Sequence, residues 1–215
     1  MKIRNESLGD QAARVLRRRI LSGECEGGSL LIEKSLAEEF GTSRGPVRDA
    51  LAQLAEDSLI AASGRSFRVL EVTAEDIEEI YDLRHLLERH AMSRAARLSL
   101  DLSSAHAALR RMREAAERGD GIAFGLADVA FHRSFPEASG QRRILTMWRQ
   151  FERSLETLLE VNPHPADDLL RAVDVHAELL RAVEEGDPAW EEQLRVHLEE
   201  ARDRFALGYA ARPDA

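Results

Sequence analysis

Residues 36–51 read LAEEFGTSRGPVRDAL, and this stretch predicts two helices joined by a tight turn. Gly41 permits the left-handed backbone angles that such a turn needs. Thr42 or Ser43 can cap the second helix, and Pro46 suits its first turn, where the missing N–H costs no hydrogen bond. The stretch therefore has the character of a helix-turn-helix.

The segments on either side extend this motif into a small domain. Residues 8–21 carry apolar side chains at helical spacing, and residues 34–40 predict a shorter helix that ends at the turn. Short strands are expected at residues 59–60 and 67–70, with the turn-forming pair Ser63-Gly64 between them. Three helices followed by a hairpin are typical of a winged helix-turn-helix.

The pattern changes after residue 72, where no further strand is predicted. Thr73 and Asp76 match a capping box at the start of a long amphipathic helix that runs to about Leu98. Five more helices are expected, at residues 102–118, 121–138, 141–160, 166–185 and 189–209. The fold class is therefore mainly α, with a winged helix-turn-helix over residues 1–72 and an all-helical domain over residues 73–215.

The charge is divided unevenly between these two parts. The whole chain of 215 residues has a net charge of −9, which by itself argues against DNA binding. Residues 1–70 hold 11 basic and 10 acidic side chains, whereas residues 71–215 hold 19 basic and 29 acidic ones. The acidity therefore belongs to the second part, and the first part is free to present a basic face to phosphates.

Composition narrows the class of protein further. Hydrophobic residues make up 44% of the chain, which supports real cores, yet no apolar run approaches the roughly 20 residues that span a membrane. The N-terminus lacks the apolar stretch of a secretory signal, and Cys25 alone cannot form an internal disulfide framework. We expect a cytoplasmic protein that does not enter membranes.

Two arginines at the start of the second helix suggest DNA contacts. Arg44 and Arg48 lie four residues apart and so project from one helix face, which would enter the major groove. Their planar guanidinium groups can bind guanine or phosphate through two hydrogen bonds. Gly64-Arg65 at the hairpin tip could reach the minor groove or an adjacent phosphate. The alternative is that both arginines merely solvate an exposed helix and pair with nearby acidic residues.

The sequence resembles the GntR family of transcription regulators, in its FadR-like branch. Three stretches carry the resemblance: residues 36–44, 46–51 and 54–60. It implies a homodimer on a short palindromic operator in double-stranded DNA. It also implies DNA contacts from Lys34, Arg44 and Arg48, assisted by Gly64 and Arg65.

Two positions depart from the family pattern. Gly45 stands where Thr is more frequent, so a hydroxyl contact to phosphate is lost. Ser58 stands where Gly is usual, which affects only the local turn.

The second part resembles the helical FCD ligand-binding domain of the same branch, over about residues 73–207. The resemblance rests on residues 80–84, 128–132, 175–180, 186–187 and 197–198. This resemblance implies a bundle of six or seven helices around a cavity, often with a divalent metal inside.

The residues themselves offer a ligand set for such a metal. Asp128 and His132 are spaced to project from one apolar helix face, where burial without partners is expensive. His176 and His197 lie on later helices among apolar residues. Three imidazoles and one carboxylate suit Zn, Ni, Co, Fe or Mn and leave positions open for a ligand.

The alternative for any one of these histidines, taken alone, is a core residue that forms hydrogen bonds and binds no metal. The sequence does not show that the three helices converge; the resemblance implies it. The other four histidines do not match the pattern and are interpreted as surface or structural: His85, His90, His106 and His164.

Arg84 is the candidate effector-binding residue. An arginine that faces a cavity with a metal can clamp an anion, and the resemblance implies a small organic acid whose carboxylate is shared between metal and arginine. The alternative for Arg84 is a salt bridge to Glu88, one helical turn away.

Two other functions compete with an effector-controlled regulator. A metal-dependent hydrolase or oxygenase on a helical bundle could use the same ligands to activate water. However, no further acid is placed as a general base, and an enzyme leaves the first 70 residues unexplained, so no catalytic residue is assigned. A third possibility is a DNA-binding protein whose metal is purely structural.

Overall fold

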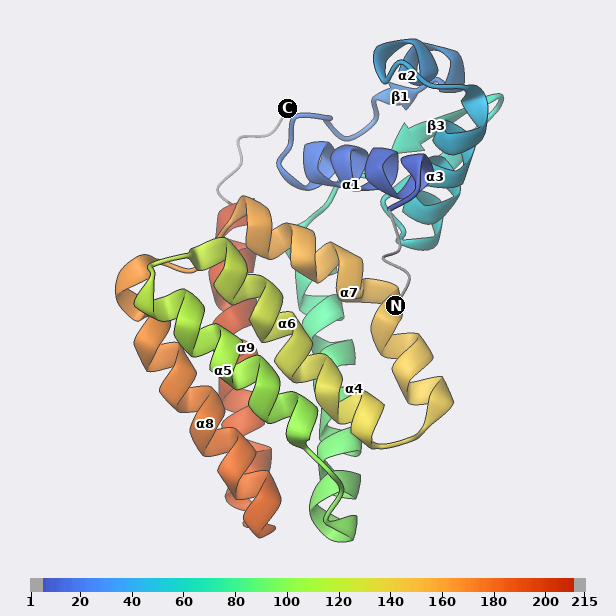
Figure 1. The fold of residues 1–215 in the computed structure, drawn as a ribbon. Coiled ribbons are helices and arrows are strands. Elements are labelled where there is room, and N and C mark those ends of the chain that lie inside the picture. Colours follow the sequence, from blue (N-terminus) through green and yellow to red (C-terminus); the bar gives the residue numbers. More distant parts are fainter. Residues whose placement is uncertain (1–5, 211–215) are drawn as a thin grey trace. The chain divides into compact units, whose positions relative to one another are not determined.

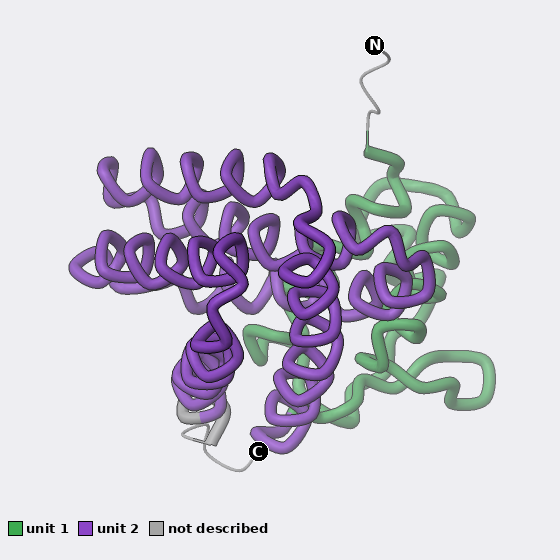
Figure 2. Tube along the Cα trace, turned by 90° about the horizontal axis from the view of Figure 1, so that it is seen from below, with its two compact units in different colours: residues 1–72, 213–215 green, residues 73–212 purple. Residues whose placement is uncertain are grey.

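A computed structural model describes residues 6–210 of the chain. The described residues divide between Val72 and Thr73 into two compact units, coloured green and purple in Figure 2. Both units are built mainly from helices, in line with the mainly α fold class.

The first unit contains three helices and a small sheet. The helices are α1 (Leu8–Leu21), α2 (Glu33–Glu39) and α3 (Arg44–Glu56). The strands are β1 (Leu30–Leu31), β2 (Ile60–Ser63) and β3 (Ser66–Val69). The predicted helices and hairpin are confirmed, whereas β1 was not predicted because two residues carry no alternating pattern.

Packing in the first unit follows from small and branched apolar residues. Helix α1 packs on α3, and Ala12, Ala13 and Ala50 form a cluster against which Phe40 lies. The sheet has the order β1-β3-β2 with antiparallel pairs, so that Arg68 of β3 lies opposite Leu30. The hairpin between β2 and β3 is the wing of a winged helix-turn-helix.

Capping explains where several helices begin. Ser7 and Asp10 form a capping box at α1, and Thr73 and Asp76 form the predicted one at the helix that starts at Ala74. Ser43 occupies the N-cap of α3, but its side chain makes no capping hydrogen bond. The prediction that the side chain of Thr42 or Ser43 caps this helix was therefore wrong, whereas the predicted start of the helix was correct.

The second unit is a helical bundle. Its described residues form six α-helices and one short 3-10 helix. The α-helices are α4 (Ala74–Leu98), α5 (Ser103–Glu117), α6 (Gly121–Ala138), α7 (Arg142–Val161), α8 (Leu169–Glu185) and α9 (Ala189–Ala210). The predicted helix over residues 166–185 is interrupted at its start, where Ala166–Asp168 form the 3-10 turn.

Helix α6 lies at the centre of this bundle. It packs against α4, α5 and α7, and Figure 1 shows α5, α6 and α8 side by side. Phe124, Phe131 and Phe135 of α6 are fully buried. Gly125 lets α7 approach closely, because a Cβ at this position would come within 2.9 Å of Leu159 Cβ. The helix that holds Asp128 and His132 is therefore fixed on several sides.

Candidate metal centre and DNA-binding surface

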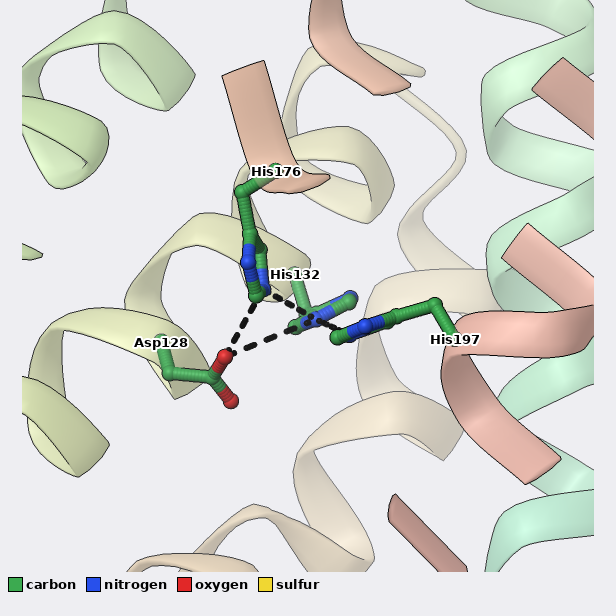
Figure 3. A group of neighbouring side chains, drawn as sticks. All are labelled: Asp128, His132, His176 and His197. Carbon is green, nitrogen blue, oxygen red and sulfur yellow. Dashed lines mark hydrogen bonds and ion pairs between the residues drawn. The ribbon is translucent and has the colours of Figure 1, made fainter. Parts of the chain in front are cut away.

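Four polar side chains from three helices meet inside the second unit. Asp128 and His132 come from α6, His176 from α8 and His197 from α9, and Figure 3 shows their side chains directed toward one another. One ligand atom from each of the four lies within 4.8 Å of the others. His132 and His176 are completely buried, and Asp128 is 6% exposed. The structure thus brings together the full candidate set.

The spacing of these atoms suits a single metal ion. His176 Nε2 lies 2.8 Å from Asp128 Oδ1 and 3.3 Å from His132 Nε2. His132 Nε2 lies 3.1 Å from His197 Nε2. Ligands about 2.1 Å from a common metal, at angles between octahedral and tetrahedral values, are about 3.0–3.4 Å apart.

Hydrogen bonds on the far side of two rings direct lone pairs toward the centre. His176 Nδ1 lies 2.7 Å from the Ala172 carbonyl oxygen, which only accepts, so this nitrogen carries the proton. His132 Nδ1 lies 2.7 Å from the Glu88 carboxylate and is protonated for the same reason. With the proton on Nδ1, each ring turns its Nε2 toward the centre, where a metal would accept the lone pair of that nitrogen. The residues present therefore fit a metal.

The charge states of the cluster also suit a divalent cation. Burial lowers the pKa of His197 well below its usual value, and the neighbouring His176 and His132 lower it further. Burial alone would raise the pKa of Asp128, but its hydrogen bond and charge interaction with His176 leave that pKa well below the usual range. His197 is therefore neutral and Asp128 ionised at neutral pH, as metal ligation requires.

Glu88 on α4 supports the centre from behind and was missed as a site residue. Its Oε2 accepts from His132, and its Oε1 accepts from Trp148 Nε1 and from Arg84 Nε, both at 3.0 Å. Burial would raise the pKa of Glu88, but the charges of His132 and Arg84 lower it to about 2. The sequence flagged Glu88 only as an alternative partner of Arg84.

Arg84 forms the salt bridge that the sequence offered as the alternative, and it also lies at a cavity. It forms the buried salt bridge to Glu88, with 4% of its side chain exposed. It also lines a small cavity beside the four candidate ligands, together with Asp128 and His197. The cavity volume is about 60 Å³, several times the roughly 15 Å³ that one water needs. The space suits a few polar atoms next to the ligands.

Two further residues of this cavity were not predicted. His164, interpreted from sequence as surface or structural, is half-buried and lines the cavity, as does Arg204 of α9. Burial lowers the pKa of His164 to about 4, so its ring is neutral. By contrast, His106 is exposed and hydrogen-bonded to Glu184, and His90 is hydrogen-bonded to Gln141.

The candidate DNA-binding residues form an exposed set on the first unit. Lys34 lies on α2, and Arg44 and Arg48 lie in the first turns of α3. Gly64 and Arg65 lie at the tip of the wing. Gly64 has a φ of +63°, which favours glycine at this turn. Arg48 pairs with Glu33 at 3.3 Å rather than with the acidic residues of its own helix, and it remains 68% exposed. Such exposed pairs are weak, so a phosphate can replace Glu33.

No helix in the described part of the chain is long and apolar enough to cross a membrane.

Comparisons with known proteins assign both units to families. Residues 8–69 match the bacterial regulatory proteins of the gntR family, and residues 79–200 match the FCD domain. The gluconate operon transcriptional repressor of Bacillus licheniformis is 30% identical over 188 residues, which cover 84% of this chain and 77% of that protein. The repressor of the same name from Bacillus subtilis strain 168 is 29% identical over 206 residues, covering 92% and 85%.

Solved structures agree with these matches. A GntR transcriptional regulator from Rhodococcus sp. RHA1 superposes with a TM-score of 0.70 at 27% identity, covering 95% of this chain and 99% of that one. Escherichia coli McbR/YncC, at 24% identity and a TM-score of 0.69, shares the fold.

The matched families and relatives are transcription regulators, which leaves the hydrolase or oxygenase alternative without support. The chain is a member of the GntR family of bacterial transcription regulators, with an N-terminal DNA-binding domain of that family and a C-terminal FCD effector-binding domain.

Proposed function

We propose that this protein is a metal-dependent repressor that a small organic acid controls. The observation that carries the proposal is the convergence of Asp128, His132, His176 and His197 beside a cavity that Arg84 also lines. A divalent metal held by these four side chains would be Zn, Ni, Co, Fe or Mn, since no thiolate is among the ligands. It would supply positive charge and open coordination positions for an oxygen ligand.

The effector is an organic acid in this proposal because Arg84 and Arg204 line the cavity beside the candidate metal ligands. Arg84 would pair with the effector carboxylate while Glu88 holds its Nε. Sugar acids are suitable first candidates, because two relatives are named as gluconate operon repressors.

The DNA-binding half of the proposal assigns operator contacts to Lys34, Arg44 and Arg48, with Gly64 and Arg65 at the wing. Their exposure and the family match support it. A homodimer would place two α3 helices about 34 Å apart on a palindromic operator in the cytoplasm. Analytical ultracentrifugation in the presence of operator DNA tests the dimer, and a monomer at micromolar concentration would contradict it.

The metal and effector roles are tested together by two alanine variants, His176→Ala and His197→Ala. We expect elemental analysis to find stoichiometric metal in the wild type and a loss of most of it in each variant, because each change removes one of four ligands. His106→Ala is the matched control, since this histidine is exposed and hydrogen-bonded to Glu184, outside the cluster. Titration with sugar acids and other small acids should release operator DNA from the wild type and from His106→Ala, but not from His176→Ala or His197→Ala.

Two results would count against parts of this proposal. Full metal content with unchanged affinity in both variants would eliminate the site. Metal lost with the effector response intact would make the metal structural, which is the competing function for this cluster.

A further inference from the structure

Arg204 on α9 is a cation in the cavity that no carboxylate neutralises. It lies seven residues after His197, so both side chains project from about the same face of the helix. Both line the cavity together with Arg84. Within residues 6–210, no carboxylate oxygen lies within ion-pair distance of the Arg204 guanidinium, whereas Arg84 has Glu88.

The groups around Arg204 leave it with unused donors. Its Nη1 and Nη2 lie 3.1 and 3.2 Å from the two ring nitrogens of His164, and its Cζ lies 5.0 Å from the centre of the Phe205 ring. A neutral imidazole offers one lone pair, but a guanidinium has five N–H donors. Arg204 Nε is buried and has no hydrogen-bond partner in the described structure.

The acidic residues that line the same cavity do not form an ion pair with Arg204 in the described structure. Asp168 lies 3.6 Å from Arg171, which also lines the cavity. Glu200 lies one turn before Arg204 on α9 and lines the same cavity without reaching ion-pair distance of Arg204. Asp128 belongs to the candidate metal cluster.

Two guanidinium groups from different helices therefore line one cavity. Arg84 is on α4 and Arg204 is on α9, and both are close enough to the buried Tyr81 hydroxyl to act on its pKa. A half-buried cation with unmet donors is costly unless an anion supplies acceptors. The proposed function pairs one carboxylate of the effector with Arg84. Arg204 would then be available to bind a second carboxylate.

We propose that Arg204, with His164 beside it, forms a second anion subsite, and that the effector is a short dicarboxylic acid. One carboxylate binds at the metal and Arg84, and the other binds at Arg204. Arg84 and Arg204 line the same cavity, which favours a short chain between the two carboxylates. This inference rests on the proposed function, since it needs an effector in this cavity.

The test compares acids that differ only in the second carboxylate. Succinate, glutarate and adipate are titrated against butyrate, pentanoate and hexanoate by calorimetry on the metal-loaded full-length protein. We expect at least one diacid to bind tenfold or more tightly than its matched monoacid. Arg204→Gln should abolish that preference and leave both the monoacid affinity and the metal content unchanged.

Arg202→Gln is the matched control. Arg202 lies on the same helix, pairs with Asp203 and lines a different groove. It should keep the diacid preference, and Arg204→Lys should restore part of it. The melting temperature of ligand-free Arg204→Gln should not fall, because the change removes an unneutralised cation.

The outcomes separate this inference from the proposed function. Equal affinity of diacids and monoacids for the wild type overturns the second subsite and leaves an organic-acid effector standing. An equal loss of both ligand classes in Arg204→Gln also overturns it, because Arg204 would then support the cavity in general. If no acid binds metal-loaded wild type, the effector role proposed for the cavity fails, and the subsite fails with it.

Discussion

At the scale of single residues, the buried carboxylate of Glu88 connects most of the polar groups in the second unit. It accepts hydrogen bonds from His132, Trp148 and Arg84, and its exposed fraction is 0%. Its pKa of about 2 means that it stays ionised at any pH at which the protein would work. A charged acceptor on Nδ1 of His132 both orients the ring and makes Nε2 a better metal ligand.

Glu88→Gln is therefore expected to weaken metal binding by about 10- to 100-fold without removing any ligand. The amide oxygen can still accept from His132 but carries no charge. Affinity is measured by competition with a coloured chelator, and circular dichroism checks the fold. Glu152→Gln is the control, because Glu152 is also a buried carboxylate of this unit but pairs with Arg133. Wild-type metal affinity in Glu88→Gln would rule out a positioning role.

At the scale of secondary-structure elements, the end of α3 carries a local conflict. Ser58 has a φ of +58°, in the left-handed region that costs a residue with a Cβ about 1–3 kcal/mol. The hydrogen bonds of a Schellman motif hold it there, since Ser58 N donates to Ala55 O and Leu59 N donates to Leu54 O. The departure from the family's Gly at this position thus places strain between α3 and the wing.

Ser58→Gly should stabilise the protein by about 1 kcal/mol, because glycine adopts this conformation without strain but loses more entropy on folding. The free energy of unfolding in urea, followed by circular dichroism, measures the change. Ser22→Gly serves as control, since Ser22 caps α1 with a φ of −81° and has no strain to relieve. A Ser58→Gly protein that is no more stable than the wild type would show that the turn is unstrained.

At the scale of the whole molecule, the proposed homodimer would bring two DNA-binding units to one operator. Each protomer presents three candidate phosphate-binding cations, Lys34, Arg44 and Arg48, although the chain as a whole carries a charge of −9. DNA binding through these three residues would depend on local positive charge and not on the net charge of the chain. If all six cations of a dimer contact phosphates, the logarithm of affinity should fall with the logarithm of salt at a slope of about −5.

Arg48→Ala is expected to weaken operator binding by about 1–3 kcal/mol per protomer, a loss that a symmetric dimer incurs twice. The salt dependence identifies the contact: a shallower slope indicates phosphate, and an unchanged slope indicates a base. Arg14→Ala provides the comparison, because Arg14 is an exposed arginine of α1 that pairs with Glu6 and lies outside the candidate surface. Unaltered operator affinity in Arg48→Ala would refute its assignment.

Local signals were enough to predict much of the architecture. The bounds of α1 and α6 agree with the sequence-based ranges, because helix periodicity, caps and glycine breaks act within a few residues. The capping box at Thr73 was likewise readable, since all its partners lie within one turn. Strand β1 was not, because a two-residue strand exists only through its pairing with β3.

The candidate ligands were named from sequence, but only the tertiary structure decided that they meet. The spacing of Asp128 and His132 on one helix is a local property. The approach of His176 and His197 depends instead on how α8 packs against α4 and α5, and on how α9 packs against α4 and α8. The places of Glu88, His164 and Arg204 around the cluster and its cavity were not predicted, for the same reason. A buried carboxylate, a neutral imidazole or an unneutralised guanidinium acquires its role from neighbours on other helices, and packing, not local pattern, brings those neighbours together.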